Sequence, residues 1–326
     1  MQAPRPRAIR PSILPDRLKA AVPWWAKIAL KIVLSHLPLG YGFWARANLF
    51  RHGTMDDPTA ALATSRVYHP EASARAPLPS GFAVLELGPG DSLLASAAAW
   101  DFGAGRIVAS DIGAFATTTL PMLLRLDSGL RAAGLRPLPL EGAATAEEVL
   151  ERIGLEYRPN GLVGLSALPA ASVDLIWSNA VLEHVRRDDF APTIAACARL
   201  LKPSGVMLHG MDFRDHLGGA LNNLRFSPAV WESPLFANAG FHTNRLSPSE
   251  VVAAFEVAGL AVEFVSVERW QTIPTPREKL DPAFRDRSEA DLTTRGVKLL
   301  ARHARAGPEA VAPPQAPGPP KAAIPV

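Results

Sequence analysis

The chain has 326 residues, 48% of them hydrophobic, which is enough for one large core with appendages. Its formal net charge is only +3 and its Lys and Arg residues form no dense stripe with interleaved aromatics, so the sequence does not indicate a nucleic-acid-binding protein. Cys197 is the single cysteine, which excludes an intramolecular disulfide and a cysteine-rich metal site. We expect it to be a small buried side chain.

Residues 24–39 are strongly apolar, and Lys27 and Lys31 recur at helical spacing, so the polar stripe is narrow. The stretch is too short and too charged for a membrane-spanning helix, and the lysines argue against a signal peptide. Two interpretations remain. We favour a helix packed on the rest of a cytoplasmic protein; the other is peripheral membrane contact through residues 18–40, with Trp24 and Trp25 at the interface.

Residues 82–111 have the pattern of a nucleotide-binding βαβ half. Phe82–Leu87 is an apolar run short enough for a buried parallel strand, and Gly88, Pro89 and Gly90 end it. A helix over 93–100 and a second strand over 106–110 follow, and Asp111 stands at the tip of the second strand. The glycines allow close approach of the backbone to a ligand, and an acid at this tip can accept hydrogen bonds from ribose hydroxyls.

The glycine spacing argues against a dinucleotide. A G-x-G-x-x-G fingerprint would place its third glycine at position 93, where Leu93 stands. Glu86 instead gives the pattern acid-x-Gly-x-Gly, in which a carboxylate faces the cationic end of a ligand. Without a ligand, the same residues would be a strand, turn and helix of an ordinary α/β domain.

Residues 113–154 form an insertion with two helical stretches separated by Pro137 and Pro139. The third strand is either Leu155–Arg158 or Leu162–Leu165, and the sequence does not decide between them. Ser172–Ser178 is the fourth strand. Residues 195–212 contain a helix, a Lys-Pro-x-Gly turn and the fifth strand.

Further along, Ser247 and Glu250 have the spacing of a helix start, and Gly259 ends that helix. Residues 261–269 and 296–302 are the remaining strands. Residues 304–326 are rich in proline and alanine, and we expect them to be disordered.

The first motif, Glu86-Leu-Gly88-Pro-Gly90, the acid Asp111, the segment 172–185 and the segment 195–212 together resemble the class I S-adenosylmethionine-dependent methyltransferases. One departure is Ser92, where many members carry a third glycine. The resemblance implies an α/β, Rossmann-like fold with a mostly parallel sheet, an antiparallel last strand and an N-terminal helical lid. It implies S-adenosyl-L-methionine as the cofactor.

The resemblance also assigns cofactor contacts residue by residue. Many members place an acid after the third strand to meet the adenine amino group, but residues 164–169 contain none, and we name Ser166 as its substitute. The predicted cofactor-binding residues are Glu86, Gly88, Pro89, Gly90, Asp111, Ser166 and Asn179.

The resemblance divides the chain into a basic and aromatic helical segment over 1–79, a methyltransferase domain over 80–303 with insertions at 113–154 and 213–246, and a tail over 304–326. The segment before the first motif usually forms a lid over the substrate. Tyr41, Trp44, Arg51 and His52 are therefore candidates to line an acceptor pocket, although each could equally be a core or surface residue.

Two clusters could activate an acceptor. His184 follows the fourth strand, where parallel sheets place their ligand crevice, and titrates in the useful range. A structural or cofactor-side role is an equal alternative, because the Leu-Glu-His pattern is widespread among relatives with different acceptors. Asp212, Asp215 and His216 follow the fifth strand, where His216 would be a base oriented by a carboxylate. A capped loop remains an alternative, as does a metal bound by these last three residues, although ligands so close in sequence are a weak metal signal. We predict no metal, with His216, Asp212 and His184 as the catalytic candidates.

Residues 217–246 are rich in asparagine, arginine and aromatic residues, which suit a sugar or a phosphorylated group but also occur in ordinary loops. The stretch loosely resembles a bacterial subgroup linked to cell-surface polysaccharide and glycolipid synthesis. The substrate-binding candidates are Arg225, Trp231, His242, Asn244, Arg245 and, from the lid, His52.

We therefore predict methyl transfer to an oxygen of a small or glycan-type acceptor, with no nucleic-acid partner. An amine, carbon or carboxylate acceptor would need no strong base and is one alternative. A cofactor-binding but non-catalytic regulatory subunit is another.

Overall fold

The computed structural model describes residues 22–35 and 56–304, and all structural statements below concern these residues. The elements in chain order are α2 (Trp24–Ser35), α4 (Pro58–Arg75), β1 (Ala83–Leu87), α5 (Leu94–Ala97), η1 (Ala98–Trp100), β2 (Arg106–Ser110), α6 (Leu120–Ala132), α7 (Ala146–Arg152), β3 (Leu155–Arg158), α8 (Gly161–Ser166), β4 (Val173–Asn179), η2 (Leu182–His184), α9 (Arg187–Leu200), β5 (Leu201–Asp212), η3 (Asn222–Arg225), α10 (Pro228–Trp231), α11 (Pro234–Ala237), α12 (Pro248–Val257), β6 (Leu260–Arg269), η4 (Arg277–Lys279), α13 (Pro282–Arg285), α14 (Glu289–Thr293) and β7 (Thr294–His303).

The strands form one seven-stranded sheet in the order β3-β2-β1-β4-β5-β7-β6. Strands β1 to β5 are parallel, whereas β7 runs antiparallel to both β5 and β6. The order reverses between β1 and β4. In open α/β sheets, ligands bind at such a reversal, outside the carboxyl ends of the strands. This mixed sheet confirms the predicted fold class and its antiparallel last strand.

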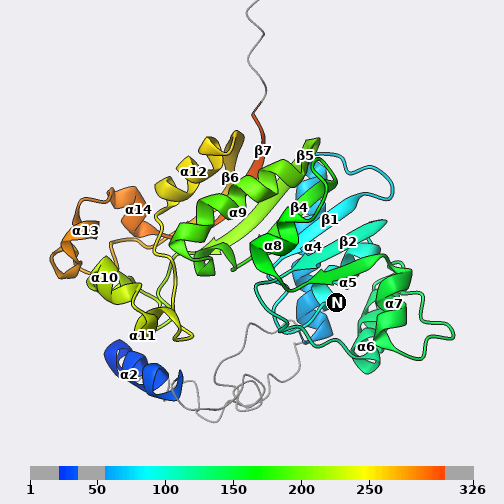
Figure 1. Ribbon diagram of the computed structural model, residues 1–326, viewed down its shortest axis with the longest axis horizontal. Coiled ribbons are helices and arrows are strands. Elements are labelled where there is room, and N and C mark those ends of the chain that lie inside the picture. Colours follow the sequence, from blue (N-terminus) through cyan, green and yellow to red (C-terminus); the bar gives the residue numbers. More distant parts are fainter. Residues whose placement is uncertain (1–21, 36–55, 305–326) are drawn as a thin grey trace, which may run out of the picture.

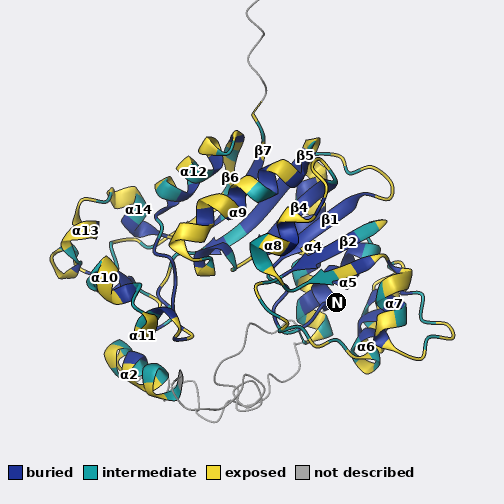
Figure 2. Cartoon of the chain, viewed as in Figure 1, coloured by how far each residue is buried: buried dark blue, intermediate teal, exposed yellow. Residues whose placement is uncertain are grey.

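Helices cover both faces of the sheet, so the core has three layers (Figure 1). Alternate residues of β1 enter opposite cores: Val84 packs in the cluster that includes α4, α5 and α6, and Leu85 in the cluster that includes α8, α9 and α12. All five residues of β1 are buried, as expected for a central strand with helices on each side (Figure 2). Cys197 is fully buried in the second cluster, as predicted.

The third strand is the first of the two predicted segments, Leu155–Arg158. The second segment lies within α8, where Gly164 and Leu165 are buried. The predicted helix over 93–100 divides into the short α5 and the 3-10 turn η1. The Lys-Pro-x-Gly turn lies inside β5, where the register shifts between the pairs Val173–Leu201 and Leu175–Val206.

Helix α2 packs against the insertion that follows β5. Its inner residues Trp24, Ile28 and Ile32 contact a small apolar cluster of the insertion that includes Trp231 and Phe241. This supports the packed-helix interpretation for one face. The other face is exposed: Trp25 and Val33 are each 61% accessible. Among the described helices, none is both long and apolar enough to cross a membrane.

Candidate functional site

The glycine turn after β1 lies against the segment that follows β4. Gly88 and Gly90 have φ values of +65° and +73°, which suit glycine far better than other residues. A Cβ atom on Gly88 would lie 2.6 Å from both methyl groups of Val181. Both the backbone conformation and this close approach therefore require glycine at position 88.

Asp111 follows β2 at the same edge of the sheet. Its Oδ1 accepts the N–H of Ile112 at 2.7 Å, and its backbone oxygen accepts the N–H of Gly161 at 2.8 Å. The second bond brings the start of α8 beside Asp111. Ile112 is 81% exposed, a large apolar side chain open to solvent at this position. Asp111, Ile112 and Gly161 thus form a surface that can hold both a ribose and a flat base.

Ser166 does not lie on this surface. The Arg199 side chain, in the last turn of α9, donates to the backbone oxygens of Leu165, Ser166 and Leu168, so the end of α8 lies beside the end of α9. Because α9 leads back to the start of β5, this is the opposite edge of the sheet from Asp111. The prediction for Ser166 is wrong. Asn160 and Gly161, at the start of α8, lie beside Asp111 instead, and the sequence did not single them out because it did not fix the third strand.

Glu86 is almost fully buried in β1, and the Ser96 hydroxyl donates a hydrogen bond to it. The pKa of Glu86 is raised to about 8, mainly because the carboxyl group is buried; the hydrogen bond from Ser96 lowers it and the charge of Asp111 raises it, and both effects are smaller than that of burial. The carboxyl group is therefore protonated at neutral pH unless a cation lies near it. Ser96, on α5, was not singled out from the sequence.

Asn179 ends β4 and is exposed at the carboxyl edge. The Tyr68 hydroxyl, from α4, donates to Asn179 Oδ1 at 2.8 Å. A Cβ atom on Gly210 would lie 2.1 Å from the same Tyr68 oxygen, so only a glycine at 210 allows this bond. Tyr68 therefore orients Asn179, a role that no sequence pattern indicated.

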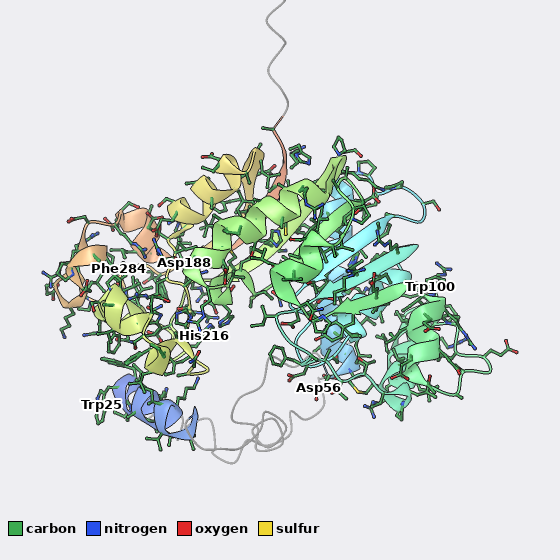
Figure 3. All side chains as sticks on the ribbon, in the orientation of Figure 1. Trp25, Asp56, Trp100, Asp188, His216 and Phe284 are labelled. Carbon is green, nitrogen blue, oxygen red and sulfur yellow. The ribbon has the colours of Figure 1, made fainter. Side chains whose placement is uncertain are left out.

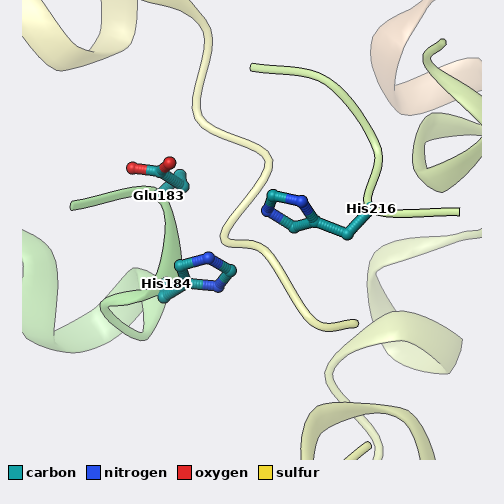
Figure 4. A group of neighbouring side chains, drawn as sticks. All are labelled: Glu183, His184 and His216. Carbon is teal, nitrogen blue, oxygen red and sulfur yellow. The ribbon is translucent and has the colours of Figure 1, made fainter. Parts of the chain in front are cut away.

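Glu183, His184 and His216 meet beyond the ends of β4 and β5 (Figure 4). One possible ligand atom from each of the three residues lies within 4.8 Å of the others. The rings of His184 and His216 stack with centroids 4.8 Å apart and an interplanar angle of 18°. His184 Nδ1 lies 3.0 Å from the backbone oxygen of His242, so that nitrogen carries the proton.

Charges around His216 differ from those predicted. Burial and the neighbouring His184 lower the pKa of His216 to about 4, so its ring is neutral at physiological pH. Asp212 does not orient it: its carboxylate binds the Arg214 guanidinium through both oxygens. Asp215 accepts the backbone N–H groups of 217, 218, 219 and 222, so it is the loop cap of the alternative interpretation.

Glu183 also belongs to this site, although the sequence singled out only its neighbour His184. It is 2% exposed, and burial raises its pKa to about 8. Its Oε1 accepts the N–H of Asp212 at 3.2 Å, whereas its Oε2 is buried without a hydrogen-bond partner among the described residues.

Most of the predicted substrate-binding residues stabilise the insertion instead. Trp231 is fully buried and donates its indole N–H to the backbone oxygen of Thr243, so it has no face for an acceptor. The polar groups of three predicted residues near Trp231 also bind the protein itself, which argues against their predicted contact with an acceptor. His242 contacts Glu232, Asn244 donates to the carbonyls of 182 and 185, and Arg245 donates to the carbonyls of 223 and 226.

Arg225 is partly buried. Its Nε donates to Asn222 Oδ1 at 2.9 Å and its guanidinium lies over the Trp24 ring. His52, with Tyr41, Trp44 and Arg51, lies outside the described residues, so its predicted contact with substrate stays a prediction.

Two cavities adjoin the site. One, of about 500 Å³, lies between α2 and the segment 216–222, and is lined by Trp24, Lys27, His216 and Asn222. The other, of about 390 Å³, lies over the ends of β4 and β5, and is lined by Tyr68, Asn179, Asp212 and Lys298. Figure 3 shows His216 between the insertion and the sheet.

Residues 85–209 match the family model described as a methyltransferase domain. A search of curated proteins gave no match.

The chain matches solved structures from three organisms at low sequence identity. An S-adenosylmethionine-dependent methyltransferase from Mesorhizobium loti is 20% identical and has a TM-score of 0.39, with 72% of this chain and 96% of that one covered. A second, from Archaeoglobus fulgidus, is 13% identical with a TM-score of 0.42, covering 80% and 99%. A chain of the solved complex with the Haloferax volcanii Trm112 methyltransferase activator is 20% identical with a TM-score of 0.42, covering 82% and 98%.

None of these comparisons supports the polysaccharide and glycolipid subgroup. The motifs on β1 and β2, the seven-stranded sheet and the match over residues 85–209 identify a class I S-adenosylmethionine-dependent methyltransferase domain in this chain.

Proposed function

We propose that this enzyme transfers the methyl group of S-adenosylmethionine to an oxygen of a small acceptor held in the cavity between α2 and segment 216–222. The observation that carries the proposal is the stacked pair of His184 and His216 beside that cavity. Methyl transfer needs mainly alignment, but a hydroxyl acceptor also needs a group that takes its proton. His216 is neutral at physiological pH, so a ring nitrogen is available for the proton, although its pKa of about 4 makes it a weaker base than an exposed histidine.

The cofactor would lie across the carboxyl ends of β1, β2 and β4. In this arrangement the backbone of Gly88, Pro89 and Gly90 faces the methionine part, and Glu86 meets its ammonium group. Asp111 accepts the ribose hydroxyls, and the exposed Ile112 packs against the adenine. Asn160 and Gly161 replace Ser166 beside the adenine edge, and Asn179 lies near the sulfonium side.

The acceptor would contact His216 directly and the other cavity-lining residues Trp24, Lys27 and Asn222. A cavity of about 500 Å³ is within the usual range of small-molecule sites. Lys27 would favour an anionic acceptor, since it supplies a positive charge to the wall. Helix α2 would then act as part of the predicted lid.

Binding calorimetry with S-adenosylmethionine and S-adenosylhomocysteine tests the cofactor part of the proposal. Asp111→Ala should weaken binding by tenfold or more, because two hydrogen bonds to a charged group are each worth about 1.5–3 kcal/mol. The control is Asp286→Ala, which changes an exposed aspartate directly after α13. This variant should bind both ligands as the wild type does. Turnover of hydroxyl acceptors, compared with turnover of amine, carbon and carboxylate acceptors, then separates the proposal from its alternatives. Product formed only from amines would overturn the oxygen assignment.

We also propose that α2 makes peripheral contact with an anionic membrane surface. Its residues Trp25, Ala29 and Val33 lie four apart on the exposed face, and Trp25 and Val33 are large and apolar. Residues 1–20 of the sequence contain five arginines or lysines before this helix, which would favour anionic lipid headgroups.

Flotation with vesicles tests this contact. Trp25→Ser with Val33→Ser should reduce binding to vesicles that contain phosphatidylglycerol, whereas Val257→Ser, which alters another exposed valine, should not. Equal binding by all three proteins would refute the contact.

A further inference from the structure

Two buried polar atoms in the Glu183, His184 and His216 cluster have no hydrogen-bond partner among the described residues. They are Glu183 Oε2 and His216 Nε2. Buried polar atoms nearly always have partners, since leaving one unsatisfied costs about 1–3 kcal/mol. Both atoms belong to the one group in the described chain whose donor atoms converge within 4.8 Å.

His184 has the surroundings of a metal ligand. Its Nδ1–H donates to the backbone oxygen of His242 at 3.0 Å, which fixes the tautomer and leaves Nε2 as the nitrogen with a lone pair. Histidines that bind metals usually donate their other ring N–H to a carbonyl or carboxylate in this way.

The turn that carries Glu183 and His184 is held in place by the insertion. Asn244 Nδ2 donates to the backbone oxygens of Leu182 and Val185 at 2.8 and 3.0 Å. The backbone N–H of Asn244 donates to the backbone oxygen of Glu183 at 2.8 Å. The Asp212 N–H holds Glu183 Oε1. Two side chains of η2 are thus fixed before any ion binds, and only His216 comes from a separate loop.

We propose that Glu183, His184 and His216 bind a divalent transition-metal ion. Two imidazole nitrogens and one carboxylate oxygen are a donor set that suits Zn²⁺ and its neighbours rather than Mg²⁺ or Ca²⁺. Tetrahedral ligand atoms around Zn²⁺ lie about 3.4 Å apart, so rotations that bring the three groups closer by about 1 Å would complete the site.

Three protein ligands leave a coordination position open, as in catalytic rather than structural zinc sites. His216 also lines the cavity of about 500 Å³, so the open position can face a molecule held there. If the proposed oxygen methylation holds, the acceptor hydroxyl would occupy it, and His216 would then hold the ion instead of taking the proton itself. The ion would lower the pKa of that hydroxyl, whose proton would pass to water before its oxygen takes the methyl group from the sulfonium.

This metal site has different ligands from the one that the sequence suggested as an alternative. That candidate used Asp212, Asp215 and His216, but Asp212 is bound to Arg214 and Asp215 caps the loop. The distant partner that the sequence lacked is the Glu183-His184 pair after β4, which the parallel order of β4 and β5 brings to His216.

The experiment is equilibrium dialysis of the full, untagged chain against Zn²⁺, with Co²⁺ as a spectroscopic probe. We expect one high-affinity ion per chain and a visible Co²⁺ absorption band, measured without cofactor or acceptor. Glu183→Gln, His184→Asn and His216→Asn should each weaken Zn²⁺ binding by about tenfold or more, equal to about 1.4 kcal/mol. Asn at 184 can still donate to the His242 oxygen, and Gln at 183 can still accept from Asp212.

His303→Gln is the matched control, since His303 lies on β7 and its Nε2 contacts the Leu201 oxygen. It should bind Zn²⁺ as the wild type does. Substoichiometric Zn²⁺ in the wild type, or equal binding by the three variants and the control, would overturn the proposal. Cofactor calorimetry on the same proteins keeps the two proposals apart, because loss of Zn²⁺ with normal S-adenosylhomocysteine binding concerns the metal site alone.

Discussion

The His184 and His216 rings stack at a centroid distance of 4.8 Å, although one follows β4 and the other follows β5. The parallel pairing of these strands, which aligns Asn179 with Gly210, places both segments at the same edge of the sheet. The stack therefore depends on the topology rather than on any local motif. It brings the two histidines predicted from separate parts of the sequence into one group.

Replacing either histidine by asparagine should reduce methyl transfer without reducing cofactor binding. Loss of a proton acceptor typically costs about 10²–10⁴-fold in rate, and the cofactor contacts proposed above do not involve these rings. The measurement is S-adenosylhomocysteine formation with a hydroxyl acceptor, alongside calorimetry. His303→Gln should leave both unchanged. Full turnover by His184→Asn and His216→Asn would remove the pair from the chemistry.

Binding of S-adenosylmethionine should release a proton near pH 7. Glu86 is protonated there because burial raises its pKa to about 8, and a bound ammonium group would lower that pKa again. Calorimetry in buffers with different ionisation enthalpies measures the number of protons released. We expect a value near one for the wild type.

Glu86→Gln should abolish the proton release, because the amide cannot ionise, and should also weaken binding. Glu256→Gln, on the exposed face of α12, is the control and should release the same proton as the wild type. Proton release that persists in Glu86→Gln would show that another group titrates.

Gly88→Ala should destabilise the protein more than Gly134→Ala does. Both glycines have positive φ, +65° and +70°, so each alanine incurs a backbone cost of about 1–2 kcal/mol. At Gly134 the new methyl group meets nothing within 4 Å, but at Gly88 it lies 2.6 Å from Val181. Thermal unfolding of both variants separates the two effects.

The second change Val181→Ala should recover part of the Gly88→Ala loss, since it removes the two methyl groups involved. Val181→Ala should not recover the part of the stability loss that comes from the positive φ value at position 88. Equal stability of the Gly88 and Gly134 variants would mean that the glycine turn moves freely away from Val181.

The sequence predicted those strands whose residues form a clear local pattern. The strands β1 and β2 are continuous apolar runs because helices cover both of their faces, so they could be located to within a residue. Strand β3 is at an edge of the sheet and buries only Leu155 fully, which gave it no stronger signal than the apolar residues of α8.

The insertion residues were misinterpreted for a related reason. A segment that leaves the sheet for some thirty residues must bury its own apolar groups and satisfy its own backbone. Trp231 and Arg245 are buried in the insertion and donate hydrogen bonds to its backbone oxygens. The residue types Trp and Arg do not by themselves distinguish this structural role from sugar binding. The pairing of Glu183 with His216 and of Tyr68 with Asn179 depends on strand order, which one sequence does not specify.

Stability should be greatest at about pH 6. Burial lowers the pKa of His69 to about 4, of His209 to about 3 and of His216 to about 4, so folding requires these rings to be neutral. A depressed histidine pKa means that the unfolded chain binds more protons between the folded pKa and about 6.5. Stability is therefore lost as the pH falls through this window.

Glu86 and Glu183 have the opposite effect. Their pKa values are raised to about 8, so the folded chain binds more protons than the unfolded chain between about pH 4.5 and 8. Stability falls as the pH rises through that range, by up to about 1.4 kcal/mol per pH unit for each group. Below about pH 6 the three histidines outweigh the two glutamates, and above about pH 7 nearly all of the effect comes from the glutamates.

Thermal unfolding at pH 5 to 8.5 should therefore show a maximum at about pH 6, and the double variant Glu86→Gln with Glu183→Gln should lose most of the decline above it. A wild-type melting temperature that rises steadily to pH 8 would contradict the assignment of protonated, buried carboxyl groups to β1 and η2.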